Sequence, residues 1–255
     1  MTRLLLLLAA LLALALPARA ALTPAELAEA ELNPPAGAAL PLDLPLRDEA
    51  GRAVTPAAVL VGRPAVLLLA DFTCETLCGT AIGLAANALA GTGADAVLLV
   101  IGLDPRDGPA EAAAMKSAYL APYPEVAARA SFLTGAAPVL ARAQAALGYH
   151  ARFDAEADRY AHPLAAVVLT PAGDVSRTIS GIALDAETLG PALREAAEGR
   201  TGLGLLQGLR LFCYGLDPAH GIYNAIVRRG LAVGTGAVIV LMAIGVLLMR
   251  RRRRA

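Results

Sequence analysis

The segment AVLLLADFTCETLCG, residues 65–79, decides the fold because it joins a short apolar run to two closely spaced cysteines. Its first six residues are all apolar and follow a Gly-Arg-Pro turn, which is typical of a buried strand. Cys74 and Cys78 come directly after this strand, and residues 82–89 show a helical pattern. A buried strand that leads through two cysteines into a helix indicates an α/β protein.

Short apolar runs and helical patterns continue to alternate along the middle of the chain. We expect helices at residues 109–120, which begin with proline, at 137–147, and at 185–198, where Asp185 is a natural N-cap. We expect further strands at residues 96–103, 131–134, 164–169 and 175–180, and a short hairpin around the polar turn 47–52. This order predicts a thioredoxin-like α/β sandwich with a mixed central sheet.

Charge separates the middle of the chain from its ends. The 255 residues carry 22 basic and 22 acidic side chains, and 57% of all residues are hydrophobic. Nine arginines lie near the two ends, so the 13 basic and 22 acidic residues between positions 21 and 227 give a net charge of −9. Such an acidic middle part argues against a basic nucleic-acid-binding protein, and no nucleic-acid partner is expected.

Residues 1–20 have the pattern of a secretory signal peptide. Arg3 is followed by an unbroken apolar run of 13 residues, and Ala18-Arg19-Ala20 fits the small-x-small cleavage rule. This run is shorter than the ~20 residues that span a bilayer, although an uncleaved anchor is the alternative. We therefore expect the domain that follows to be exported to the periplasm.

A second apolar segment lies near the other end of the chain. Residues 231–249 are uncharged and mostly apolar, with two arginines before them and five after them. This pattern predicts a transmembrane helix at 230–250 and, by the positive-inside rule, a cytoplasmic tail at 251–255. A buried core helix is the alternative, which the flanking arginines disfavour. The expected protein crosses the cell inner membrane once, with a domain at 21–200 and a juxtamembrane linker at 201–229.

Cys74 and Cys78 are spaced so that both sulfurs can bind one metal ion. At positions i and i+4 of a helix start, their sulfurs lie on one face, and the helix dipole is expected to lower the thiol pKa. A disulfide would require the first turn to unwind, because such helical neighbours lie about 5–6 Å apart at Cβ. The pair therefore favours metal binding over a structural disulfide. Asp71, Asp104 and Asp107 follow strands nearby, and we expect these carboxylates to be solvated.

A third ligand is expected at His162, which comes just before the strand at 164–169. In a thioredoxin-like fold the loop before that strand packs against the start of the dithiol helix. Two thiolates and one imidazole suit Cu(I), can hold Cu(II) with added oxygen ligands, and leave zinc open. We expect His150 and His220 to be surface residues and Cys213 to be a buried thiol.

Five short motifs occur in a fixed order along the chain. They are Cys74-Glu75-Thr76-Leu77-Cys78, Asp104-Pro105-Arg106-Asp107, Phe132-Leu133-Thr134-Gly135, Tyr160-Ala161-His162, and Phe212-Cys213-Tyr214-Gly215-Leu216-Asp217-Pro218. This ordered set, over about residues 40 to 230, resembles the SCO/SenC family. The last motif is similar to the C-terminal extension of membrane-anchored bacterial members.

The resemblance implies a thioredoxin-like copper-binding protein that helps to assemble the dinuclear copper centre of cytochrome c oxidase. It implies that Cys74, Cys78 and His162 hold one copper ion, either Cu(I) or Cu(II). The implied partners are the copper-bearing oxidase subunit, other copper chaperones and a thioredoxin-like reductant. Two positions depart from the family pattern, because Glu75 stands where many members have proline and Pro163 where a small or hydroxyl residue is more usual.

Two functions remain open at this point. The first is a copper metallochaperone, which is not an enzyme and needs both cysteines and the histidine. The alternative is a thiol-disulfide oxidoreductase that keeps the cysteines of an oxidase subunit reduced, which needs Cys74 and Cys78 but not His162. The spacing of the two cysteines is one residue longer than in the usual redox motif, which counts against the alternative.

Overall fold

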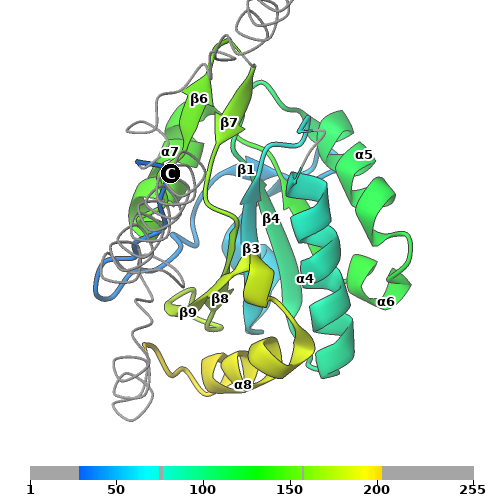
Figure 1. The fold of residues 1–255 in the computed structure, drawn as a ribbon, viewed down its shortest axis with the longest axis vertical. Coiled ribbons are helices and arrows are strands. Elements are labelled where there is room, and N and C mark those ends of the chain that lie inside the picture. The colour runs from blue at the N-terminus through cyan, green and yellow to red at the C-terminus, as the bar shows by residue number, and fades with distance from the viewer. Residues whose placement is uncertain (1–28, 75–76, 157, 203–255) are drawn as a thin grey trace, which may run out of the picture. The chain divides into compact units, whose positions relative to one another are not determined.

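Five apolar segments pair into one mixed sheet in a computed structural model that describes residues 29–74, 77–156 and 158–202 (Figure 1). The strand order is β5-β4-β3-β8-β9. The first three of these strands run parallel to one another, whereas β8 is antiparallel to both β3 and β9. The strands are β3 (Ala65–Ala70), β4 (Val97–Gly102), β5 (Ala130–Leu133), β8 (Ala165–Leu169) and β9 (Val175–Ser180).

Helices cover both faces of this sheet. On one face, Val66 and Leu68 of β3 pack in a core with four helices: α4 (Cys78–Thr92), α5 (Pro109–Leu120), α6 (Pro124–Ala127) and α8 (Ala186–Ala197). On the other face, Leu67 and Leu69 pack with α3 (Pro56–Leu60), α7 (Ala137–Leu147) and the segment around Leu44. Alternate residues of a strand point to opposite faces, so β3 is buried along its whole length and contributes to both cores.

Local sequence fixes where these helices begin and end. The Asp185 carboxylate accepts a hydrogen bond from the Thr188 N–H at 2.8 Å and caps α8, as predicted. Gly148 ends α7 with a φ of 61°, and a Cβ there would collide with the backbone carbonyl of Asn33. Only glycine meets both requirements without strain.

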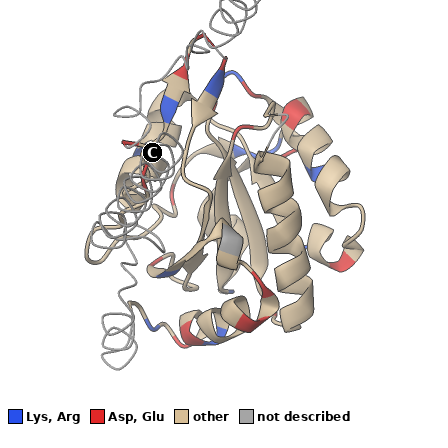
Figure 2. Ribbon diagram, viewed as in Figure 1, with Lys and Arg blue, Asp and Glu red and all other residues tan. Residues whose placement is uncertain are grey.

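The helix α4 lies beside the sheet and differs from its neighbours in charge. Figure 2 marks no Lys, Arg, Asp or Glu on the ribbon of α4, whereas α5 and α8 carry acidic residues. Leu77 and Leu84, which are 62% and 42% exposed, lie at its start and in its middle. The outer side of the dithiol helix is therefore uncharged, with the polar Thr80 and Asn87 exposed beside these leucines.

The predicted mixed sheet with helices is confirmed, and most elements lie within a few residues of their predicted bounds. The helix α4 begins at Cys78 rather than at residue 82. The hairpin at 47–52 is reduced to β1 (Leu46–Arg47) and β2 (Ala53–Val54), because the turn is closed by the Asp48 side chain, which accepts from the backbone N–H groups of Ala50 and Arg52. A second hairpin, β6 (Arg152–Asp154) with β7 (Arg159–Ala161), was not predicted.

The predicted signal peptide, the transmembrane helix at 230–250, the cytoplasmic tail and nearly all of the linker lie outside the described residues, as do Cys213 and His220. All elements above belong to one of the two units into which the chain divides, Met1–Gly199. Among residues 29–202, apart from the three positions left out, no helix is both long and apolar enough to cross a membrane.

Candidate metal centre

The two cysteines lie at the junction between β3 and α4. Cys74 comes four residues after the strand, and its backbone N–H donates to the Asp71 carbonyl at 3.2 Å. Cys78 is the first residue of α4 and is only 2% exposed, whereas Cys74 is partly exposed. Both are present as thiols, and the two side chains are joined by a hydrogen bond.

His162, which is distant in sequence, lies against this junction. It lies between β7 and β8, and its Nε2 atom is 3.1 Å from the Cys78 sulfur, although 84 residues separate the two. The pairing of β8 with β3 explains the contact, because antiparallel strands bring the end of one next to the start of the other. The structure thus brings together Cys78 and His162, as the topology predicted.

Burial controls the protonation of both groups. Loss of water, together with the neighbouring Cys74, raises the pKa of the Cys78 thiol to about 12. The same burial lowers the pKa of His162. The predicted lowering of the thiol pKa by the helix dipole is therefore wrong for Cys78, because desolvation outweighs the dipole. A neutral thiol faces a neutral imidazole.

The surroundings of the pair are apolar. Leu68 of β3 and Ala81 and Ile82 of α4 line the space beside Cys78 and His162. Tyr119 of α5 lies so close to Gly79, the residue after Cys78, that a Cβ at that glycine would collide with the tyrosine ring. These contacts keep water from the buried thiol and bring α5 close to the start of α4.

A third residue completes the environment of the imidazole. The Tyr149 hydroxyl lies 2.8 Å from Nδ1 of His162 and 3.0 Å from the carbonyl oxygen of Pro163. The tyrosine is 2% exposed and belongs to the core on the opposite face of the sheet from Cys78. The peptide bond before Pro163, whose isomer the sequence left open, is trans.

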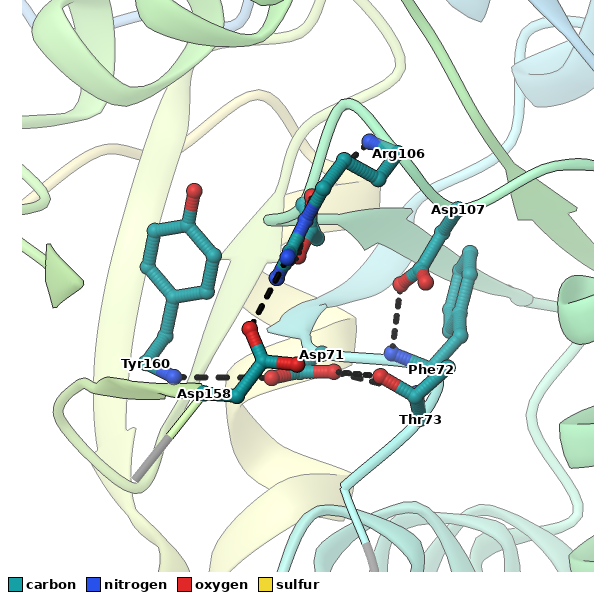
Figure 3. A network of polar contacts seen from close by, with 8 residues as sticks. Asp71, Phe72, Thr73, Arg106, Asp107, Asp158 and Tyr160 are labelled. Atoms are coloured by element: carbon teal, nitrogen blue, oxygen red, sulfur yellow. Dashed lines mark hydrogen bonds and ion pairs between the residues drawn. The ribbon is translucent and has the colours of Figure 1, made fainter. Parts of the chain in front are cut away.

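The carboxylates after β3 and β4 form a buried network beside the site (Figure 3). Asp71 accepts from the backbone N–H and the hydroxyl of Thr73 at 3.0 and 2.9 Å, and from the Tyr160 N–H at 3.4 Å. Asp107 accepts from the Phe72 N–H at 3.0 Å. Asp71, Asp104 and Asp107 are 2%, 3% and 7% exposed, so the expectation that they are solvated is wrong. They are buried because backbone groups and side chains, some close in sequence and some from distant segments, supply their hydrogen bonds.

Arg106 joins this network to the β6–β7 hairpin. Its guanidinium donates to Asp104 and, at 2.8 Å, to Asp158 (Figure 3). It also lies 4.9 Å from the centre of the Phe153 ring. Hydrogen bonds from Arg106 hold the pKa of Asp104 below its usual value. Among the described residues no cation pairs with Asp107, and burial raises its pKa to about 6. Since the hairpin leads directly to His162, Arg106 links the two halves of the site.

Only some of the predicted site residues are in contact in the structure. Cys78 contacts both Cys74 and His162, while His150 is exposed as predicted. Within the described part of the chain, no group of three or more His, Cys, Asp or Glu residues is arranged as a metal site. Sequence reasoning missed Tyr149 and Asp158. Tyr149 carries no motif, since it simply follows the glycine that ends α7.

Similar folds occur among solved structures, at low sequence identity. A candidate electron-transfer protein from Aquifex aeolicus VF5 is 19% identical, with a TM-score of 0.57, and the match covers 64% of this chain and 95% of that one. Copper-bound ScoI from Arabidopsis thaliana is 18% identical, with a TM-score of 0.51 and coverages of 61% and 96%. BsSco, a member of the Sco family of cytochrome c oxidase assembly proteins, is 18% identical, with a TM-score of 0.51 and coverages of 65% and 97%.

These likenesses show that the chain shares the fold of Sco proteins. No protein-family model matches the sequence, and no curated protein matches it either.

Proposed function

We propose that this protein is a copper metallochaperone, which binds one copper ion through Cys74, Cys78 and His162 and helps to assemble the dinuclear copper centre of cytochrome c oxidase. The observation that carries the proposal is the 3.1 Å distance between the Cys78 sulfur and Nε2 of His162. Support also comes from two proteins of the same fold, one solved with copper bound and one a member of an oxidase assembly family.

The donor atoms suit copper in chemical character. Thiolate sulfur and imidazole nitrogen are the ligands that Cu(I) prefers, and a Cu(II) ion would need additional oxygen ligands. Cys74 is the partly exposed member of the pair and Cys78 is buried. An incoming ion would therefore bind Cys74 first and Cys78 second. The apolar lining made by Leu68 and Ile82 would keep water from a bound ion.

The proposal includes a place in the cell. The signal-peptide pattern of residues 1–20 and the arginine-flanked apolar segment at 231–249 support a periplasmic domain held at the inner membrane by a single span. The partner of such a domain would be the copper-bearing oxidase subunit, with a thioredoxin-like reductant to keep the thiols reduced.

A thiol-disulfide oxidoreductase is the second candidate, and the hydrogen bond between Cys74 and Cys78 favours it. In that reaction the two thiols would form one disulfide while a partner's disulfide is reduced to two thiols. The buried Cys78, with its raised pKa of about 12, is a poor attacking group, so Cys74 would have to attack first. A disulfide switch is described for BsSco.

Copper titration of the reduced full-length chain tests the first proposal. We expect one copper per chain for the unchanged protein and a loss of at least about tenfold in affinity for Cys74→Ser, Cys78→Ser and His162→Ala. His150→Ala is the matched control, because it removes an exposed histidine that belongs to none of the motifs. Unchanged affinity and absorption spectrum in His162→Ala would overturn the three-ligand site. Disulfide reduction that survives in His162→Ala, without copper binding by the unchanged protein, would favour the second candidate.

A further inference from the structure

We infer that Tyr149 is the positioning residue of His162, holding the imidazole in the tautomer that leaves Nε2 unprotonated and turned towards Cys78. The geometry stands by itself, whereas the consequence for copper rests on the proposed function. None of the motifs along the chain includes this tyrosine.

Tyr149 is rigidly placed. It follows Gly148 at the end of α7, its N–H donates to the Gln144 carbonyl at 2.9 Å, and it bridges to Leu32 of the leading segment. Its ring is buried in the core formed with α7. Because the hydroxyl of a buried tyrosine needs hydrogen-bond partners, the contacts to His162 and Pro163 account for its polar end.

Proton counting around this hydroxyl selects the tautomer. The Pro163 carbonyl can only accept, so at 3.0 Å it takes the single proton of the Tyr149 hydroxyl. The oxygen of Tyr149 must then accept from Nδ1 of His162, which lies 2.8 Å away. Nδ1 also lies 3.2 Å from the Pro163 carbonyl, which again can only accept. Both contacts of Nδ1 are satisfied when that nitrogen carries the proton.

The opposite tautomer would leave the Pro163 carbonyl without a hydrogen-bond donor from Tyr149 or His162. If Tyr149 donated to an unprotonated Nδ1, neither it nor the imidazole would donate to the Pro163 carbonyl. With the proton on Nδ1, the lone pair of Nε2 faces the Cys78 sulfur at 3.1 Å. The imidazole is therefore oriented to accept a hydrogen bond from the Cys78 thiol or to bind a metal without rearranging. Outer partners of this kind fix the orientation of histidine ligands.

The test compares Tyr149→Phe with the unchanged, reduced, full-length chain. Phenylalanine keeps the ring and removes only the hydroxyl, so the core stays filled. The first measurement is the 15N spectrum of histidine-labelled, metal-free protein, with His162 assigned through His162→Gln. We expect His162 to be protonated at Nδ1 in the unchanged protein and to populate both tautomers in Tyr149→Phe.

The second measurement is Cu(I) affinity, which we expect to fall by about 10- to 100-fold in Tyr149→Phe. Tyr160→Phe is the matched control, since this tyrosine lies two residues from His162 but its ring packs on Phe153 instead. We expect both measurements to be unchanged in the control.

The two readouts separate this inference from the proposed function. If the unchanged protein binds no copper, the proposed function fails, and the 15N spectrum still decides the role of Tyr149. An identical His162 spectrum in Tyr149→Phe overturns the inference even when copper binds. A changed spectrum with unchanged copper affinity overturns the consequence for copper.

Discussion

The guanidinium of Arg106 donates to the carboxylate of Asp158 at 2.8 Å and so joins the β4–α5 loop to the tip of the β6–β7 hairpin. The same guanidinium also pairs with the buried Asp104. One side chain therefore holds a segment after the cysteines against the segment that leads to His162.

Replacing Arg106 by glutamine should lower the thermal unfolding temperature by several degrees, because Asp104 is left buried with an unpaired charge. Calorimetry of Arg106→Gln and of the double variant with Asp104→Asn checks this, and the double variant should recover most of the loss. Arg63→Gln is the control, since its partner Asp95 is 79% exposed and the pair contributes little. Equal losses in Arg106→Gln and Arg63→Gln would contradict the role of Arg106.

The buried Asp107 should make the protein more stable as the pH falls towards 5. Its pKa is raised to about 6 in the folded state from 3.8, so the folded state binds this proton more tightly between those values. Stability contributed by the proton is present at low pH and is lost as the pH rises through 6.

Urea unfolding of Asp107→Asn and the unchanged protein at several pH values measures this contribution. The amide cannot ionise, yet its oxygen can still accept from the Phe72 N–H. We expect the variant to lack a gain of about 1–2 kcal/mol between pH 7.5 and 5. Parallel pH profiles for the two proteins would show that Asp107 does not titrate in this range.

Alanine should be far less tolerated at Gly148 than at Gly93. Both glycines end helices with φ near +60°, but nothing lies within 4 Å of a Cβ at Gly93, whereas the Asn33 carbonyl blocks one at Gly148. We expect a loss of about 1 kcal/mol for Gly93→Ala and about 2–4 kcal/mol for Gly148→Ala. Chemical unfolding of the two variants gives the comparison, and similar losses would argue against the close approach of Asn33.

Alkylation should distinguish the two site cysteines in the reduced protein. Cys74 is partly exposed, while Cys78 is buried and its thiol pKa is raised, so iodoacetamide should modify Cys74 at least about tenfold faster. Mass spectrometry of peptides over time measures both rates in one sample. In urea the two rates should converge, and a rapid reaction at Cys78 in the folded protein would be inconsistent with its burial.

The sequence predicts the central elements well because their patterns are local. The apolar run of β3 and the proline-started α5 need no distant partner to be recognised. The β6–β7 hairpin escapes such reasoning, since its three-residue strands are held by a contact between the Phe153 and Tyr160 rings and by Arg106 lying over Phe153. Long-range contacts of this kind leave no periodic signal.

For the site, too, local patterns could be predicted from the sequence and long-range contacts could not. Motif order and topology predict that His162 approaches the cysteines, and the structure bears this proximity out for Cys78. The burial of Asp107 could not be foreseen, because its hydrogen-bond donor, Phe72, lies 35 residues away. Desolvation of Cys78 likewise depends on packing by α4 and its neighbours, which the spacing of the cysteines does not reveal.

The antiparallel register of β3 and β8 determines where the chain can accept insertions or deletions. The register pairs Leu67 with Val167 and so fixes the dithiol end of one strand beside the histidine end of the other. Insertions in the turns around α6, between these strands in sequence, leave that register untouched. A single residue added between His162 and Ala165 would shift the histidine relative to Cys78. The loops remote from the site can therefore vary widely, while the few residues between His162 and β8 cannot change in number.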